Sequence, residues 1–158
     1  MQPIRHSDPY VRFRPHGPLP AAGRCCCPRV TTAYLAHVLS ENPIHCSLCR
    51  GEVAPERIGF DAATAELIAR WNTVFGAVYE LWLDSGPYEL WAESELLRPD
   101  SPVNESGLEA CTQLSNYVPA RYLWFWQGKR PVRCPVCGSS LRETEGTHFV
   151  CTACAVYI

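Results

Sequence analysis

The chain has 158 residues and a hydrophobic content of 47%, the size and composition of one globular domain, which excludes a wholly disordered protein. No apolar run approaches the ~20 residues that span a bilayer. The polar, proline-broken first twenty residues also lack the apolar core of a signal peptide. We therefore expect a cytoplasmic protein that makes no membrane contact. Its ten cysteines would pair as disulfides only if it were secreted, so we expect metal ligands instead.

The formal net charge of −2 hides an uneven distribution. Residues 1–60 hold seven Arg against four acidic residues, residues 61–128 three against ten, and residues 129–158 four basic residues against two acidic ones. Two zinc ions, each bound by four thiolates, would add about −4 to the total. A dedicated nucleic-acid-binding protein usually has the opposite balance, so the charge argues against that class.

Residues 1–24 are interpreted as an extended arm. Within it, Tyr10 to Arg14 alternates apolar and basic side chains, the period of a strand with one solvated face. This segment is either an edge strand or a place where Arg12 and Arg14, beside aromatic rings, contact nucleic acid.

Residues 25–60 form an N-terminal cysteine module, predicted to be a zinc knuckle or half of a zinc ribbon. Cys46 and Cys49, followed by a glycine, make one Cys-x-x-Cys turn. The other pair must come from the run Cys25-Cys26-Cys27, and Cys25 and Cys27 are the better pair because adjacent cysteines point in different directions. His37 and His45 are weaker candidates. A second zinc is expected here.

Residues 61–119 are an acidic helical segment. Asp61 is a candidate N-cap for a helix whose apolar residues recur at steps of three and four until Gly86-Pro87. A second helix is predicted over residues 88–97, and a third from Ser101-Pro102 or Asn104 to about residue 116. Three residues of this segment are expected in the core: Trp82, Trp91 and Cys111.

Residues 120–158 are predicted to be a C-terminal zinc ribbon. A strand-like run at 120–126 leads to two Cys-x-x-Cys pairs separated by thirteen residues: Cys134, Cys137, Cys151 and Cys154. Gly138 relieves the backbone after the first pair, and a turn at Glu145-Gly146 separates two strands. His148 could replace a thiol but is expected to face solvent. A thioredoxin-type redox pair does not match two such pairs in a β-rich tail.

No catalytic motif accompanies these cysteines. The zinc-deaminase and zinc-protease signatures, the phosphate-binding loop and the Gly-x-Ser-x-Gly elbow are all absent from the sequence. We therefore expect that the chain is not an enzyme and that its zinc is structural.

The segments "HCSLCRGEVAPERIG", "LWLDSGPYELWA", "DSPVN" and the terminal "CPVCGSSL…CTAC" resemble a family of bacterial proteins of unknown function, described as Zn-ribbon-containing and nucleic-acid-binding. The resemblance covers residues 24–158. It implies a zinc ribbon and a cytoplasmic bacterial protein. The triple cysteine at 25–27 departs from a plain Cys-x-Cys, which leaves the choice of ligands open.

These observations predict an α+β fold, with a small helical bundle flanked by zinc-ribbon β-hairpin modules at both ends. The expected function is that of a protein-interaction module with one or two structural zinc ions and a protein partner. One alternative is a zinc-ribbon nucleic-acid-binding protein that uses Lys129, Arg130, Arg133, Arg142, Arg12 and Arg14. A second is an antitoxin or immunity protein whose acidic segment covers a basic partner.

Overall fold

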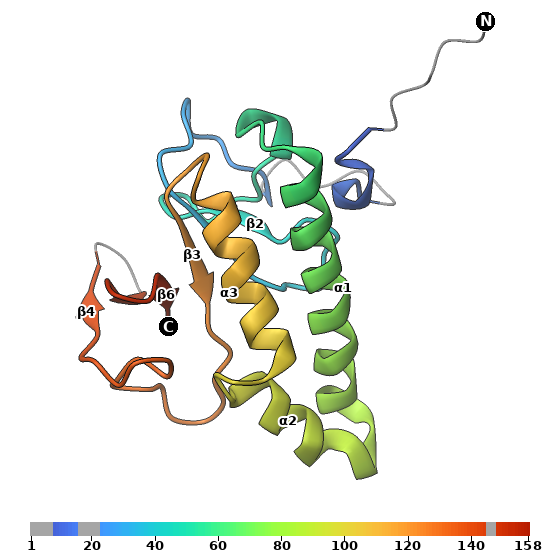
Figure 1. Ribbon diagram of the computed structural model, residues 1–158, viewed down its shortest axis with the longest axis vertical. Helices are drawn as coiled ribbons and strands as arrows, with labels where there is room; N and C mark the ends of the chain where they lie inside the picture. The colour runs from blue at the N-terminus through green and yellow to red at the C-terminus, as the bar shows by residue number, and fades with distance from the viewer. Residues whose placement is uncertain (1–7, 16–22, 145–147) are drawn as a thin grey trace, which may run out of the picture.

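The computed structural model describes residues 8–15, 23–144 and 148–158. It confirms the α+β class: three helices lie on one side of a mixed sheet, and the cysteine-rich modules occupy β regions near both ends of the chain (Figure 1). Within these described ranges, no helix is long and apolar enough to cross a membrane.

Six short strands form one continuous sheet in the order β2-β1-β3-β6-β5-β4. They are β1 (Ala33–Leu35), β2 (Ile44–Cys46), β3 (Ala120–Leu123), β4 (Arg142–Glu143), β5 (Phe149–Cys151) and β6 (Val156–Tyr157). The hairpin of β1 and β2 is antiparallel, as are the β4–β5 and β5–β6 pairs. β3 pairs in parallel with β1 on one side and β6 on the other, and so joins the two cysteine modules.

Helix α1 (Ala62–Asp84) is the longest element and begins where the sequence predicts. The Asp61 carboxylate accepts a hydrogen bond from the Thr64 amide at 2.8 Å, which satisfies one of the unpaired amides of the first turn. Its buried face carries Ile68, Trp71 and Phe75. Gly86, with φ +61°, follows the end of the helix and reverses the chain.

Helices α2 (Glu89–Leu97) and α3 (Pro102–Leu114) complete the helical layer. α2 ends before Pro99 because Arg98 is held in an extended conformation, as the residue before a proline usually is. The Ser101 hydroxyl caps α3 by accepting from the Asn104 amide. The first and last residues of both helices lie within two residues of the predicted ones.

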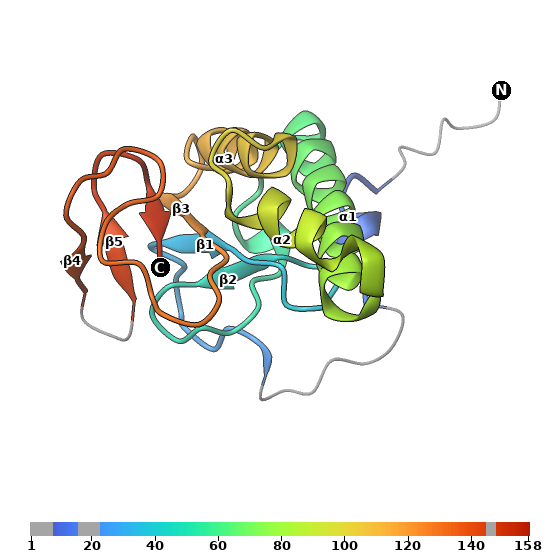
Figure 2. The same ribbon diagram turned by 90° about the horizontal axis from the view of Figure 1, so that it is seen from below.

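The alternation of side chains along the strands divides the apolar residues between the two faces of the sheet. Leu35, Ile44 and Tyr122 belong to the main core beneath α1 and α3, while Tyr34 and Tyr157 belong to a smaller cluster with Val150. Figure 2 shows α1 and α3 on the same side of β1, β2 and β3. The helices therefore cover one face only of this part of the sheet.

Two expectations about local structure are wrong, and a third falls on residues outside the described ranges. Tyr10–Arg14 is not a strand: residues Val11–Phe13 form one turn of 3-10 helix, with Phe13 buried against the Tyr10 and Phe60 rings. Trp91 is 51% exposed and so is not a core residue, whereas Trp82 is partly buried and Cys111 is buried. The predicted turn at Glu145-Gly146 falls outside the described residues.

Candidate metal centres

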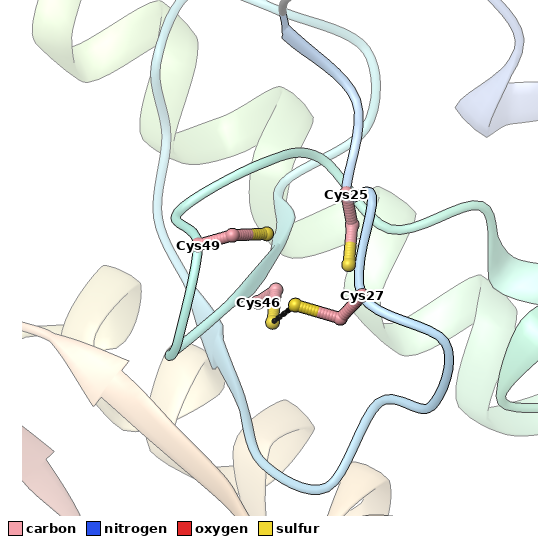
Figure 3. Close-up of side chains that lie close together, drawn as sticks. All are labelled: Cys25, Cys27, Cys46 and Cys49. Carbon is pink, nitrogen blue, oxygen red and sulfur yellow. Dashed lines mark hydrogen bonds between the residues drawn. The ribbon is translucent and has the colours of Figure 1, made fainter.

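The N-terminal module brings four cysteines together around one point. Cys46 ends β2, Cys49 closes the turn that follows, and Cys25 and Cys27 approach from the preceding segment. The four sulfurs lie within 4.8 Å of one another, and the side chains point toward a common centre (Figure 3). Gly51 permits this approach, because a Cβ at that position would lie only 2.5 Å from the backbone of Arg24 and Cys25.

The C-terminal module repeats the arrangement with Cys134, Cys137, Cys151 and Cys154, whose sulfurs also lie within 4.8 Å of one another. Cys151 ends β5 as Cys46 ends β2, and Cys154 closes the next turn. The first pair lies on a separate turn, whose flanks meet in an antiparallel bridge between Arg133 and Ser140. The site is therefore formed by two turns from opposite ends of the module.

All three Cys-x-x-Cys turns share one backbone conformation. The residue after the second cysteine has a positive φ in each: Arg50 at 62°, Gly138 at 71° and Ala155 at 52°. In the first two turns, the amide of this residue donates to the carbonyl of the first cysteine, from Arg50 to Cys46 at 2.8 Å and from Gly138 to Cys134 at 2.9 Å. This conformation directs the amides inside the turn toward the sulfurs.

Backbone amides donate to the sulfur atoms at matching positions of two turns. The Leu48 and Cys49 amides donate to Cys46, and the Val136 and Cys137 amides donate to Cys134. Donation to a sulfur stabilises the thiolate, the form that binds metal. Burial nevertheless raises the pKa of both first cysteines, because it penalises the charged form.

The second cysteines of two turns, Cys49 and Cys137, have pKa values below that of an ordinary thiol, whereas burial raises the pKa of Cys154, the second cysteine of the third turn, to about 12. Burial alone would raise the pKa of Cys49, but the Gly51 amide and neighbouring thiols donate to its sulfur and lower the pKa to about 6. The Ser139 hydroxyl and amide, with the Cys154 thiol, lower the pKa of Cys137 to about 6. Each group thus offers a metal ion one thiolate near neutral pH.

The geometry fits zinc. Tetrahedral coordination with Zn–S bonds of ~2.3 Å separates the sulfurs by about 3.8 Å. The Cys27 and Cys46 sulfurs are 3.8 Å apart, and the Cys137 and Cys151 sulfurs 3.6 Å apart. A disulfide bond would need about 2.05 Å, and none joins any of the ten cysteines, all of which lie in described segments. Both groups consist of cysteines alone, the closed donor set of a structural site.

The other sulfur and imidazole candidates lie outside the two groups. The Cys26 side chain is exposed, although its backbone amide donates to Cys49. The imidazoles stack on aromatic rings: His45 on Tyr34, and His37 beside Phe75. His148 does not face solvent as expected, because its partly buried ring stacks on Tyr157 at 5.2 Å between centroids.

The structure does not gather the six basic residues predicted to contact nucleic acid. Arg12 and Arg14 lie in the segment at 8–15, on the opposite side of the molecule from the C-terminal module (Figure 1). Arg12 donates to Glu66 and Thr73, each at 3.0 Å, and Arg14 pairs with Asp8 and Glu56. Both arginines therefore have acidic partners within the chain.

The other four basic residues belong to the C-terminal module. Arg130 lies over the Phe149 ring at 3.8 Å, and Arg133 donates to the Gly138 carbonyl at 3.1 Å. Lys129 and Arg142 are exposed. Arg133 thus supports a cysteine turn, a role that the sequence does not reveal.

Sequence reasoning also missed Arg57. Its guanidinium donates to the Cys25 carbonyl at 2.9 Å and to the Cys27 carbonyl, and so fixes the segment that carries both cysteines. The only sequence signal is the position of Arg57 a few residues after the Cys46–Cys49 turn. Such carbonyl contacts orient metal ligands without touching the metal.

Comparison of this chain with protein-family models, curated proteins and solved structures finds no match. The resemblance to a bacterial Zn-ribbon family is therefore unsupported by these comparisons, and so is nucleic-acid binding. The structure itself shows an α+β chain with two four-cysteine groups, both compatible with zinc binding.

Proposed function

We propose that this chain is a non-enzymatic protein-interaction module whose two zinc ions are purely structural. The observation that carries the proposal is the make-up of both candidate sites, four cysteine sulfurs and no other ligand type. A catalytic zinc keeps one position for water or substrate, which four thiolates do not leave. The metal supplies folding free energy to segments that are short and rich in turns.

The proposed interaction surface lies where α1 ends and α2 begins. Large apolar side chains are exposed there instead of joining the core: Leu83, Tyr88, Leu90 and Trp91. Leu90 is 81% exposed, whereas Ala92 and Leu96 are the residues by which α2 packs into the core. Large exposed aromatic and aliphatic side chains that lie close together in the chain are candidates for an interaction site.

Acidic residues accompany this surface, among them Asp84, Glu89 and Glu93, in the segment that holds ten acidic residues against three arginines. Opposite charge favours encounter and orientation of partners. The partner that we propose is therefore a protein with an apolar anchor surrounded by basic residues.

The test compares capture of proteins from an extract of the source cells by three zinc-loaded chains: the native chain, a Leu90→Asp/Trp91→Ala variant and a Val132→Asp control. Val132 is 76% exposed and lies in the C-terminal module, outside the segment that carries the proposed surface. We expect one basic protein, identified by mass spectrometry and rebinding when purified, to be captured by the native chain and the control only. Equal capture by all three chains would contradict the proposed surface.

Titration with single- and double-stranded oligonucleotides is the second arm. A module of the proposed kind should not bind them. Binding whose affinity falls by about 10³-fold or more between 50 and 200 mM salt would instead indicate several phosphate contacts and overturn the proposal in favour of nucleic-acid recognition.

A further inference from the structure

A hollow of about 540 Å³ lies where the helical layer meets the C-terminal module. One wall comes from α1, another from the segment that leaves β3, and the remainder from the end of β1 and from the C-terminal module. Its volume is within the range of small-molecule sites, which are about 300–1,000 Å³. Its lining includes no cysteine of either group and none of the four apolar residues of the interaction surface proposed above.

The apolar wall of the hollow is aromatic, and its rings already pack against one another without a ligand. Trp82 contacts Tyr79 at 5.2 Å and Phe125 at 5.0 Å between ring centroids, and Tyr79 lies 6.2 Å from Phe125. The two contacts with Phe125 are edge-to-face and the contact between Tyr79 and Trp82 is tilted, and together they hold the rings in place without a ligand. Trp126, which is 40% exposed, lines the same hollow. Such walls favour a flat ring that can stack against them.

Two imidazoles add acceptors. The Asn72 amide nitrogen donates to the Ser40 and Glu41 carbonyls, so its oxygen faces His37 Nδ1 at 2.8 Å and that nitrogen must carry the proton. His37 Nε2 is then an acceptor, and it is buried with no hydrogen-bond partner among the described residues. A buried acceptor that is left unpaired is costly unless a ligand or water pairs with it.

His148 also lines the hollow, as part of the C-terminal module. Its ring donates to the Ile158 carbonyl, and burial lowers its pKa, which favours the neutral form of the ring. Its Nε2 is also buried without a partner within the described part of the chain. Both imidazoles thus line the hollow, and each has a buried Nε2 without a partner among the described residues.

Arg130 supplies the only cation that lines this hollow in the described structure. Its guanidinium rests on the Phe149 ring at 3.8 Å, which fixes its position, and no carboxylate of the described residues pairs with it. An exposed guanidinium held in this way can receive a phosphate or carboxylate in its N–H fork.

We propose that this hollow binds a small planar aromatic anion: a flat ring with N–H or O–H donors and an attached phosphate or carboxylate. The ring stacks on one face of the aromatic wall formed by Tyr79, Trp82 and Phe125, its donors are directed to His37 and His148, and its anionic group meets Arg130. Nucleotides and aromatic carboxylic acids share this chemistry.

The test is calorimetric titration of the full zinc-loaded chain with two anions, adenosine 5′-monophosphate and indole-3-acetate, and with their neutral counterparts, adenosine and indole. We expect at least one anion to bind with a Kd below about 1 mM, and its neutral counterpart about tenfold more weakly. Whichever anion binds identifies the source class. Failure of both anions to bind would overturn the proposal.

Two charge-matched variants locate the binding. Arg130→Gln should weaken binding of the anion about tenfold and leave the neutral counterpart unchanged. Arg142→Gln, an exposed arginine of the same module, should change neither. Equal losses in the two variants would show diffuse attraction to a basic module and contradict a site at Arg130. Neither result bears on the α2 surface, so this proposal and the proposed function can fail separately.

Discussion

The position after the second cysteine of each Cys-x-x-Cys turn requires a left-handed backbone, yet three different residues occupy it: Arg50, Gly138 and Ala155. Only glycine adopts this conformation without a steric penalty, which is about 1 kcal/mol for other residues. The sites therefore differ in backbone strain although their donor atoms are the same. Gly138 has open space where a Cβ would be, so its freedom of φ is what matters there.

Two reciprocal substitutions test this strain. Ala155→Gly should raise the free energy of unfolding of the zinc-loaded chain by about 0.5–1 kcal/mol, because the strained residue is replaced by one that favours positive φ. Gly138→Ala should lower it by about the same amount or more. Urea denaturation measures both. A decrease for Ala155→Gly would show that the Ala155 methyl contributes more by packing than it costs in backbone strain.

For single residues, the sequence reveals which cysteines form the two groups but not which side chains hold the cysteine-bearing segments in place. Spacing alone brings Cys134, Cys137, Cys151 and Cys154 together, because two short turns in a β-rich segment must face each other. The carbonyl contacts of Arg57 and Arg133 depend on how distant backbone segments are folded, so their spacing gives no signal. For Arg133, the sequence therefore could not separate contact with nucleic acid from support of a cysteine turn.

Among the elements, Asn104 connects three that are separate in the sequence. Its amide nitrogen donates to the Leu96 and Arg98 carbonyls at 2.9 and 2.8 Å, where α2 ends, and more weakly to Glu95 at 3.3 Å. Its amide oxygen accepts from the Tyr122 hydroxyl of β3 at 2.9 Å. Asn104 is fully buried, and its side chain therefore links α2, α3 and β3 in the interior, although the Arg98 carbonyl also accepts from the Ser101 amide at 3.3 Å.

Asn104→Ala should lower the free energy of unfolding by about 3 kcal/mol, since it removes the buried hydrogen bonds to the Leu96 carbonyl and from the Tyr122 hydroxyl. Asn116→Ala removes the same side chain from an exposed position after α3 and should change the free energy by less than about 0.5 kcal/mol. Chemical denaturation of the zinc-loaded variants gives both values. Losses of similar size would contradict the role assigned to the buried amide.

The helices were predictable because their signals are local. Asp61 and Ser101 cap helices from positions that the sequence shows, and Gly86 and Pro99 mark where α1 and α2 end. The arm was not predictable in the same way: its alternation suggests a strand, but Phe13 turns inward onto Phe60 while the flanking arginines find acids on other segments. Contacts distant in sequence thus decided that conformation.

For the whole molecule, the central feature is one sheet that contains both metal groups. Spacing predicts two modules at the ends of a helical segment, but not that β3 lies between them and pairs with both. Pairing in parallel between strands so far apart in sequence leaves no local trace. Each four-cysteine group consequently holds a part of the same sheet, with Cys46 ending β2 and Cys151 ending β5.

The central claim about the molecule is that each four-cysteine group binds one zinc ion. Metal content per purified chain, measured by plasma mass spectrometry for the native protein and three Cys→Ser variants, tests it. We expect two zinc ions in the native chain, one in Cys134→Ser, one in Cys46→Ser, and two in Cys26→Ser, whose exposed side chain lies outside both groups. Two zinc ions in every variant, or none in the native chain, would contradict the account.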